Sequence, residues 1–139
     1  MPGFLIPADL DRMIPAGADP LPWAETNLLA SPGALVQKGT ERFRIPTLVP
    51  AVKADGSCIH FDRGLCSIHQ ISPYGCAYFD CHMSQPDGDA RSHAGLNAII
   101  EAWRAPSLYQ SIWGHLYKLG LKQQSPNVLR DRMAVMALR

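Results

Sequence analysis

Residues 56–83, GSCIHFDRGLCSIHQISPYGCAYFDCHM, contain all four cysteines of the chain and three of its five histidines. The cysteines follow the spacing Cys58-x7-Cys66-x9-Cys76-x4-Cys81. Four thiolates are a typical tetrahedral zinc shell, an imidazole can replace one of them, and an iron-sulfur cluster also accepts four thiolates. Free cysteines have no general reason to cluster. The spacing therefore predicts a metal site with Cys58, Cys66, Cys76 and Cys81 as ligands.

Three histidines lie close enough in sequence to these cysteines to supply the fourth ligand instead: His60, His69 and His82. His60 follows Cys58 by two residues, which places both on one face of an extended strand. Cys81 follows Cys76 by five residues, so the two would point in different directions in a regular helix or strand. The sequence therefore leaves open whether Cys81 or a histidine completes the site.

One alternative to a metal site stays open at this stage. Free cysteine is among the most buried residue types, and the usual C-x2-C ligand pair is absent, so the cysteines are also compatible with plain core residues. No G-x-S-x-G, H-E-x-x-H, phosphate-loop or zinc-deaminase pattern occurs. Together with a shell of four protein ligands, which leaves no position for a substrate, this favours a role other than catalysis.

Short hairpins and turns have to position these side chains. ALVQKGTERFRI, residues 34–45, predicts two short strands around a turn at Lys38-Gly39. IHFDRGLCSI, residues 59–68, predicts a second hairpin whose connection is Asp62-Arg63-Gly64. Cys58 and Cys66 would then lie at opposite ends of a tight hairpin, where side chains on one face can approach each other.

Helices are expected on both sides of the cysteine segment. Pro7 and Pro22 stand at favourable starting positions for two short helices over residues 8–14 and 23–30. Three more are predicted at 90–104, 107–119 and 127–139. Apolar spacing gives the last three their expected buried faces: Leu96, Ile99, Ile100 and Trp103; Leu108, Ile112, Leu116 and Leu119; Leu129, Met133 and Met136.

These elements predict a single α+β domain over residues 1–139, small and irregular. Its three zones are short helices and loops at 1–33, hairpins with the cysteine site at 34–83, and a helical zone at 87–139. In this fold, short β-hairpins and turns carry the Cys-rich site and pack against about three C-terminal helices.

Composition and charge narrow the setting of this domain. Hydrophobic residues make up 47% of the 139 and charged residues 18%, as in an ordinary globular protein. The N-terminal sequence lacks a signal peptide, and no apolar run reaches transmembrane length, so we expect a cytoplasmic protein in which thiols stay reduced. Residues 102–139 carry six basic side chains and one acidic side chain. This basic region is a candidate surface for a protein partner and only a weak indication of nucleic-acid binding.

Three short motifs resemble a known family. The order Asp55-Gly56-Ser57-Cys58, Cys66-Ser67-Ile68-His69 and Ser72-Pro73-Tyr74-Gly75-Cys76 is similar to the second half of the YkgJ-like cysteine-cluster family, described as a zinc- or iron-chelating domain. FLIPADLDRM also looks like a segment of that family. The resemblance implies that Cys58, Cys66 and Cys76 are ligands. It gives no support for Cys81.

The chain also departs from that family's pattern. The usual C-x-x-C-C cluster is absent, so either the native start lies upstream of Met1 or the site is completed differently. Ser72 and Ala77 replace the usual arginines. The sequence thus predicts a zinc-binding protein in which the metal has a structural or accessory role. The alternatives are an iron-sulfur protein for electron transfer or iron sensing, and a metal-free adaptor that uses the basic C-terminal helices.

Overall fold

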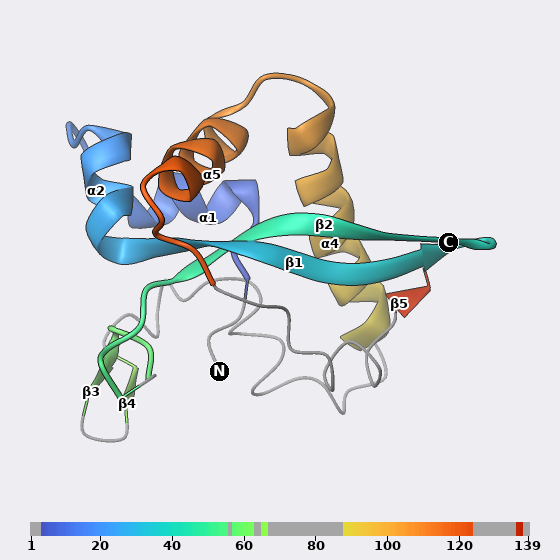
Figure 1. The fold of residues 1–139 in the computed structure, drawn as a ribbon, viewed down its shortest axis with the longest axis horizontal. Helices are drawn as coiled ribbons and strands as arrows, with labels where there is room; N and C mark the ends of the chain where they lie inside the picture. The colour runs from blue at the N-terminus through green and yellow to red at the C-terminus, as the bar shows by residue number, and fades with distance from the viewer. Residues whose placement is uncertain (1–3, 56, 63–64, 67–87, 124–135, 138–139) are drawn as a thin grey trace.

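The computed structural model describes residues 4–55, 57–62, 65–66, 88–123 and 136–137. Their helices and strands follow one another as α1 (Pro7–Met13), α2 (Pro20–Asn27), β1 (Leu28–Lys38), β2 (Glu41–Pro50), β3 (Phe61–Asp62), β4 (Leu65–Cys66), α4 (Gly88–Arg104), α5 (Leu108–Lys118) and β5 (Met136–Ala137). This arrangement confirms an α+β fold. Figure 1 shows the long β1–β2 hairpin at its centre, with α4 crossing β2 and the short β3–β4 hairpin set apart at one end.

The β1–β2 hairpin confirms the predicted turn and is much longer than predicted. Lys38 pairs with Glu41 across the turn, and the antiparallel ladder continues to Leu28 and Pro50. The predicted helix over 23–30 is wrong at both ends. Helix α2 begins at Pro20, where the Asp19 side chain caps it, and it ends at Asn27 because the next residue already pairs in β1. Long-range strand pairing therefore overrides the local helical pattern.

A β-bulge at Pro32 and Gly33 interrupts the hairpin. Ser31 pairs with Thr47 and Ala34 with Ile45, so two residues of β1 oppose Pro46 of β2. Prolines donate no N–H to the ladder, and two indoles bond to carbonyl groups of this region instead. Trp113 Nε1 donates to the Ser31 carbonyl and Trp103 Nε1 to the Pro46 carbonyl, each at 3.0 Å. The two rings meet edge to face, with their centroids 5.5 Å apart.

Helices α1, α2, α4 and α5 and the β1–β2 hairpin enclose one hydrophobic core. Its buried side chains are Phe4, Leu5, Leu10, Met13, Ala24, Leu28, Ala30, Ile45, Leu48, Val49, Leu96, Ile99, Tyr109, Ile112 and Leu116. The predicted inner face of α4 is confirmed, since Leu96 and Ile99 are fully buried and Ile100 and Trp103 pack partly buried against the core.

The predicted inner face of α5 is only half right. Ile112 and Leu116 are fully buried, but Leu108 is 43% exposed and Leu119 is 52% exposed. Tyr109 takes the inward position, and its hydroxyl donates to the Leu5 carbonyl at 2.7 Å. The same hydroxyl accepts a hydrogen bond from Leu48 N at 2.8 Å. The phenol thus joins the N-terminal segment to β2, and burial raises its pKa.

The end of the chain also differs from the prediction. Met136 and Ala137 form β5, which pairs in parallel with Val36 and Gln37 of β1, so the predicted helix over 127–139 does not extend through them. The predicted positions Leu129 and Met133 lie outside the described residues. Helices α4 and α5 confirm the first two predicted C-terminal helices, and most of the third predicted helix lies outside the described residues. No helix there is long and apolar enough to cross a lipid bilayer.

Candidate functional site

A small lobe, residues 51–66, carries the first two cysteines. An Asx turn opens it: Asp55 Oδ1 accepts hydrogen bonds from Ser57 N at 2.9 Å and from Ser57 Oγ at 2.6 Å. These bonds lower the pKa of the Asp55 carboxyl, so the turn is held by a carboxylate at neutral pH. The flanking backbone then pairs, with Val52 opposite Cys58. The turn therefore fixes the backbone at Cys58.

The second part of the lobe is the β3–β4 hairpin, which confirms the predicted one. Asp62 pairs with Leu65 and Phe61 with Cys66, so the connection is one residue shorter than predicted. Cys66 therefore stands opposite Phe61, and Phe61 follows Cys58 by only three positions in sequence. The chain turns at residues 59–60 before β3 begins. The prediction that Cys58 and His60 share one face of a continuous strand is therefore wrong.

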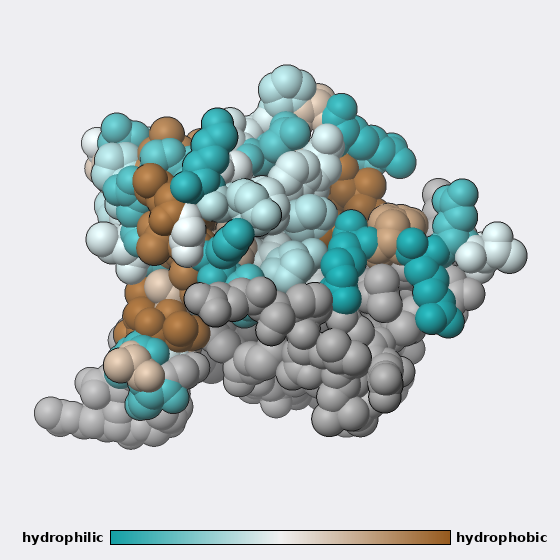
Figure 2. All heavy atoms as spheres, viewed as in Figure 1, coloured by the Kyte–Doolittle hydropathy of each residue, from teal (hydrophilic) through white to brown (hydrophobic). Residues whose placement is uncertain are grey.

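Cys58 lies outside the hydrophobic core. Its side chain is half-buried and forms no disulfide with a described residue. No described residue of the lobe belongs to the core cluster. Figure 2 shows the lobe projecting from the body, with hydrophobic atoms at the surface where the two join, and Val52 is 40% exposed. Cys58 is therefore a half-buried residue outside the core and not a core residue.

His60 is the most unusual side chain of the lobe. Its Nε2 atom is shielded from solvent and makes no hydrogen bond with any residue that the structure describes. Burial lowers the pKa of His60 below its ordinary value. By contrast, His115 Nε2 on α5 lies 2.9 Å from Glu25 Oε1. Buried polar atoms nearly always have a hydrogen-bond partner, so the Nε2 atom of His60 is an exception that needs an explanation.

The remaining candidate ligands lie outside the described residues: Cys76, Cys81, His69 and His82. The side chain of Cys66 is also not described, although its strand is. Within the described parts of the chain, no group of three or more His, Cys, Asp or Glu side chains converges. The structure thus brings the backbone of Cys58, His60 and Cys66 into one lobe. Convergence of the full predicted set stays a prediction.

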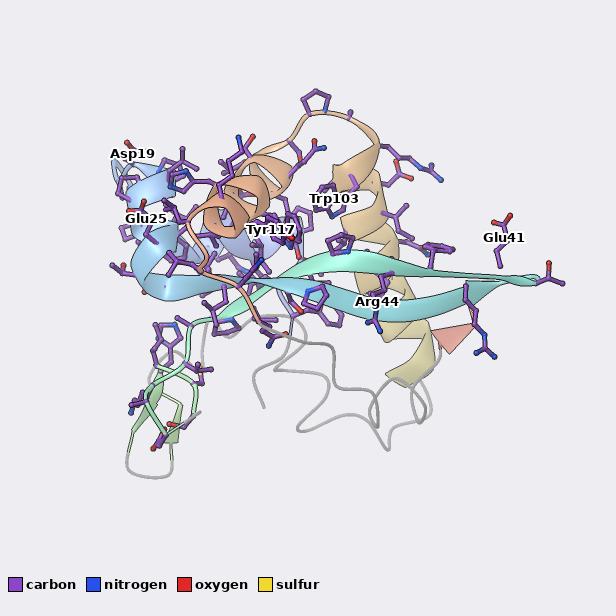
Figure 3. The ribbon with its side chains drawn as sticks, in the orientation of Figure 1. Asp19, Glu25, Glu41, Arg44, Trp103 and Tyr117 are labelled. Carbon is purple, nitrogen blue, oxygen red and sulfur yellow. The ribbon has the colours of Figure 1, made fainter. Side chains whose placement is uncertain are left out.

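Two basic side chains of the C-terminal third, the candidate partner surface, contact other residues of the molecule. Arg104 Nη1 lies 2.7 Å from Glu101 Oε1. Lys122 Nζ stands 4.1 Å from the centre of the Tyr117 ring, which stacks on Trp113 at 5.0 Å. Figure 3 shows Tyr117 on α5 and Trp103 on α4, both on the side of the hairpin that the helices cover. Arg104 and Lys122 therefore both have partners within the molecule.

Sequence reasoning gave the three nearby histidines equal standing, because nothing in residue types or spacing separates His60 from His69 or His82. The solvent-shielded Nε2 atom of His60 is a property of the folded chain and has no local sequence signal. Comparison of the chain with models of known protein families, with curated proteins and with solved structures finds no match.

Proposed function

We propose that this protein binds one metal ion, zinc, through Cys58, Cys66 and Cys76, with a fourth ligand from Cys81 or a histidine. The metal has a structural or accessory role, because a closed shell of four protein ligands leaves no position for a substrate. The similarity of these motifs to the YkgJ-like cysteine-cluster family belongs to the same proposal. We place the protein in the cytoplasm, where reduced thiols are available as ligands.

The observation that carries this proposal is the position of Cys58. Burial in the core is the ordinary reason for a free cysteine, and Cys58 is half-buried in a lobe that contributes no described residue to the core. Three more thiols follow within the next 23 residues. A cluster of thiols that begins away from the core is better explained by a shared ligand than by hydrophobic packing.

The architecture of the lobe supports the same conclusion. Strands β3 and β4 have two residues each, and an isolated two-stranded hairpin is marginally stable in water. A metal that links the turn at Cys58 to the strand at Cys66 would hold these segments together. Structural zinc sites in small peptides contribute roughly 10–16 kcal/mol of apparent binding free energy, which is ample for this task.

The proposal is tested by elemental analysis of protein prepared without air, for the native chain and for Cys58→Ser, Cys66→Ser and Cys76→Ser. We expect one zinc per native chain and loss of zinc in each variant. His115→Asn is the matched control, because it removes an imidazole that faces Glu25, far in sequence from the cysteines. The control should keep its zinc.

The alternative functions predict different results from the same preparation. An iron-sulfur protein would be brown, would contain iron and sulfide, and would bleach on reduction. A metal-free adaptor that binds a protein partner through its basic C-terminal helices would contain no metal and show four freely titrating thiols in the native state. Full zinc content in all three cysteine variants would refute the site itself.

A further inference from the structure

We propose that His60 is the fourth ligand of the metal site, through Nε2, and that the metal is therefore held by three thiolates and one imidazole rather than by four thiolates. The inference rests on the proposed metal site and specifies which residue completes it. It is carried by the solvent-shielded Nε2 atom of His60, which has no hydrogen-bond partner among the described residues.

An unpartnered nitrogen of this kind destabilises a folded protein. A polar atom that loses its hydrating water on folding and gains no hydrogen bond in exchange is unfavourable to the folded state. Imidazole nitrogen is also one of the two commonest zinc ligands in structural sites. A bond from Nε2 to a metal would replace the missing hydrogen bond, so the feature that is unfavourable without metal becomes favourable with it.

The position of His60 in the lobe fits this role. It lies in the turn between Cys58, which is fixed by the Asp55 turn, and the strand that pairs with Cys66. Cys58, His60 and Cys66 lie within nine consecutive residues, so no long loop is needed to bring these three ligands to one metal ion. Cys81, by contrast, follows Cys76 by five positions, a spacing at which the two side chains would point in different directions in a regular helix or strand.

A shell of three thiolates and one imidazole differs from a shell of four thiolates in the number of bound sulfur atoms, and the absorption spectrum of bound Co²⁺ measures that number. Co²⁺ replaces Zn²⁺ in tetrahedral sites, and its thiolate charge-transfer absorption rises with each bound sulfur. We expect the native chain to show the absorption of three thiolates. Cys81→Ser should leave both this absorption and the zinc affinity unchanged, because Cys81 is not a ligand.

Substitutions of His60 give the positive test. His60→Asn should lower zinc affinity by at least about tenfold, since even partners of ligands contribute 10–100-fold. His60→Cys should keep the metal and raise the cobalt charge-transfer absorption in the ratio of four thiolates to three. This second variant also covers the case in which His60→Asn fails to fold. His115→Asn should match the native chain in all measurements.

The outcomes separate this inference from the metal site as a whole. If Cys81→Ser loses thiolate absorption while His60→Asn keeps native affinity and spectrum, Cys81 is the fourth ligand and the inference is overturned, but the metal site stands. The same holds if His60→Cys leaves the absorption unchanged. If the native chain takes up neither zinc nor cobalt, the proposed function itself fails.

Discussion

Replacement of Gly33 by alanine tests the β-bulge that shapes the central hairpin. Gly33 has a φ of +91°, in the region that favours glycine, and it packs against the opposite strand. A Cβ atom built at this position would overlap the Ile45 carbonyl oxygen and lie 2.9 Å from Pro46 Cα. Both neighbours are backbone atoms, so no side-chain rotation can relieve the overlap. The two strands would have to move apart.

The size of the effect follows from two contributions. A non-glycine residue with positive φ costs about 1–2 kcal/mol. Separating the strands also weakens the bonds from Arg44 to the Gly33 carbonyl and from Trp103 to the Pro46 carbonyl, each worth about 1 kcal/mol. We therefore expect Gly33→Ala to lower the free energy of unfolding by about 3–4 kcal/mol. Native domains have about 5–15 kcal/mol in total, so this is a large loss.

Gly120→Ala is the matched control. Gly120 ends α5 with a φ of +76°, and a Cβ atom there would meet nothing within 4 Å. Gly120→Ala therefore carries only the conformational cost of a positive φ, about 1–2 kcal/mol. For a chain of this length, each kcal/mol lowers the melting temperature by roughly 3 °C. Thermal unfolding should therefore show Gly33→Ala about 10 °C below the native protein and Gly120→Ala about 3–6 °C below it. Equal shifts for the two variants would refute the role of the close backbone approach.

Three further predictions follow from the structure. Tyr109→Phe removes a buried hydroxyl that bonds to Leu5 and Leu48, so we expect urea unfolding to show a loss of about 2–4 kcal/mol in the free energy of unfolding. Tyr117→Phe, at a residue that is 49% exposed, should change stability little. Similar effects of both variants would contradict the bridging role of the Tyr109 hydroxyl. Gly114 lies in the interior of α5, and a methyl group added there would meet open space. Gly114→Ala should therefore raise the free energy of unfolding by about 0.5–1 kcal/mol. A decrease would contradict the open space around this position. A strong zinc chelator should make the lobe more sensitive to protease and should change the melting temperature of the core much less. Unchanged protease cleavage would show that the lobe is stable without metal.

The two kinds of error in the sequence predictions have distinct physical origins. Leucine spacing placed Leu108 and Leu119 on the inner face of α5, but the sheet and the N-terminal segment selected the face that carries Tyr109. A helix can be rotated about its axis at little local energy, so the neighbouring surface decides which stripe is buried. Residues 28–30 and 136–137 were predicted as helix and are strands, because pairing with distant partners outweighs local propensity.

The sequence by itself determined the features that depend on neighbouring residues: the turn after Lys38, the β3–β4 hairpin, the extent of α4 and α5, and the clustering of four cysteines in 24 positions. Turn chemistry, helix caps and apolar periodicity act over a few residues and can be read directly from the order of side chains. The tertiary structure alone decided that Cys58 lies outside the core and that His60 Nε2 is buried without a partner among the described residues. Burial is set by how distant segments pack, and a linear sequence does not contain that arrangement explicitly.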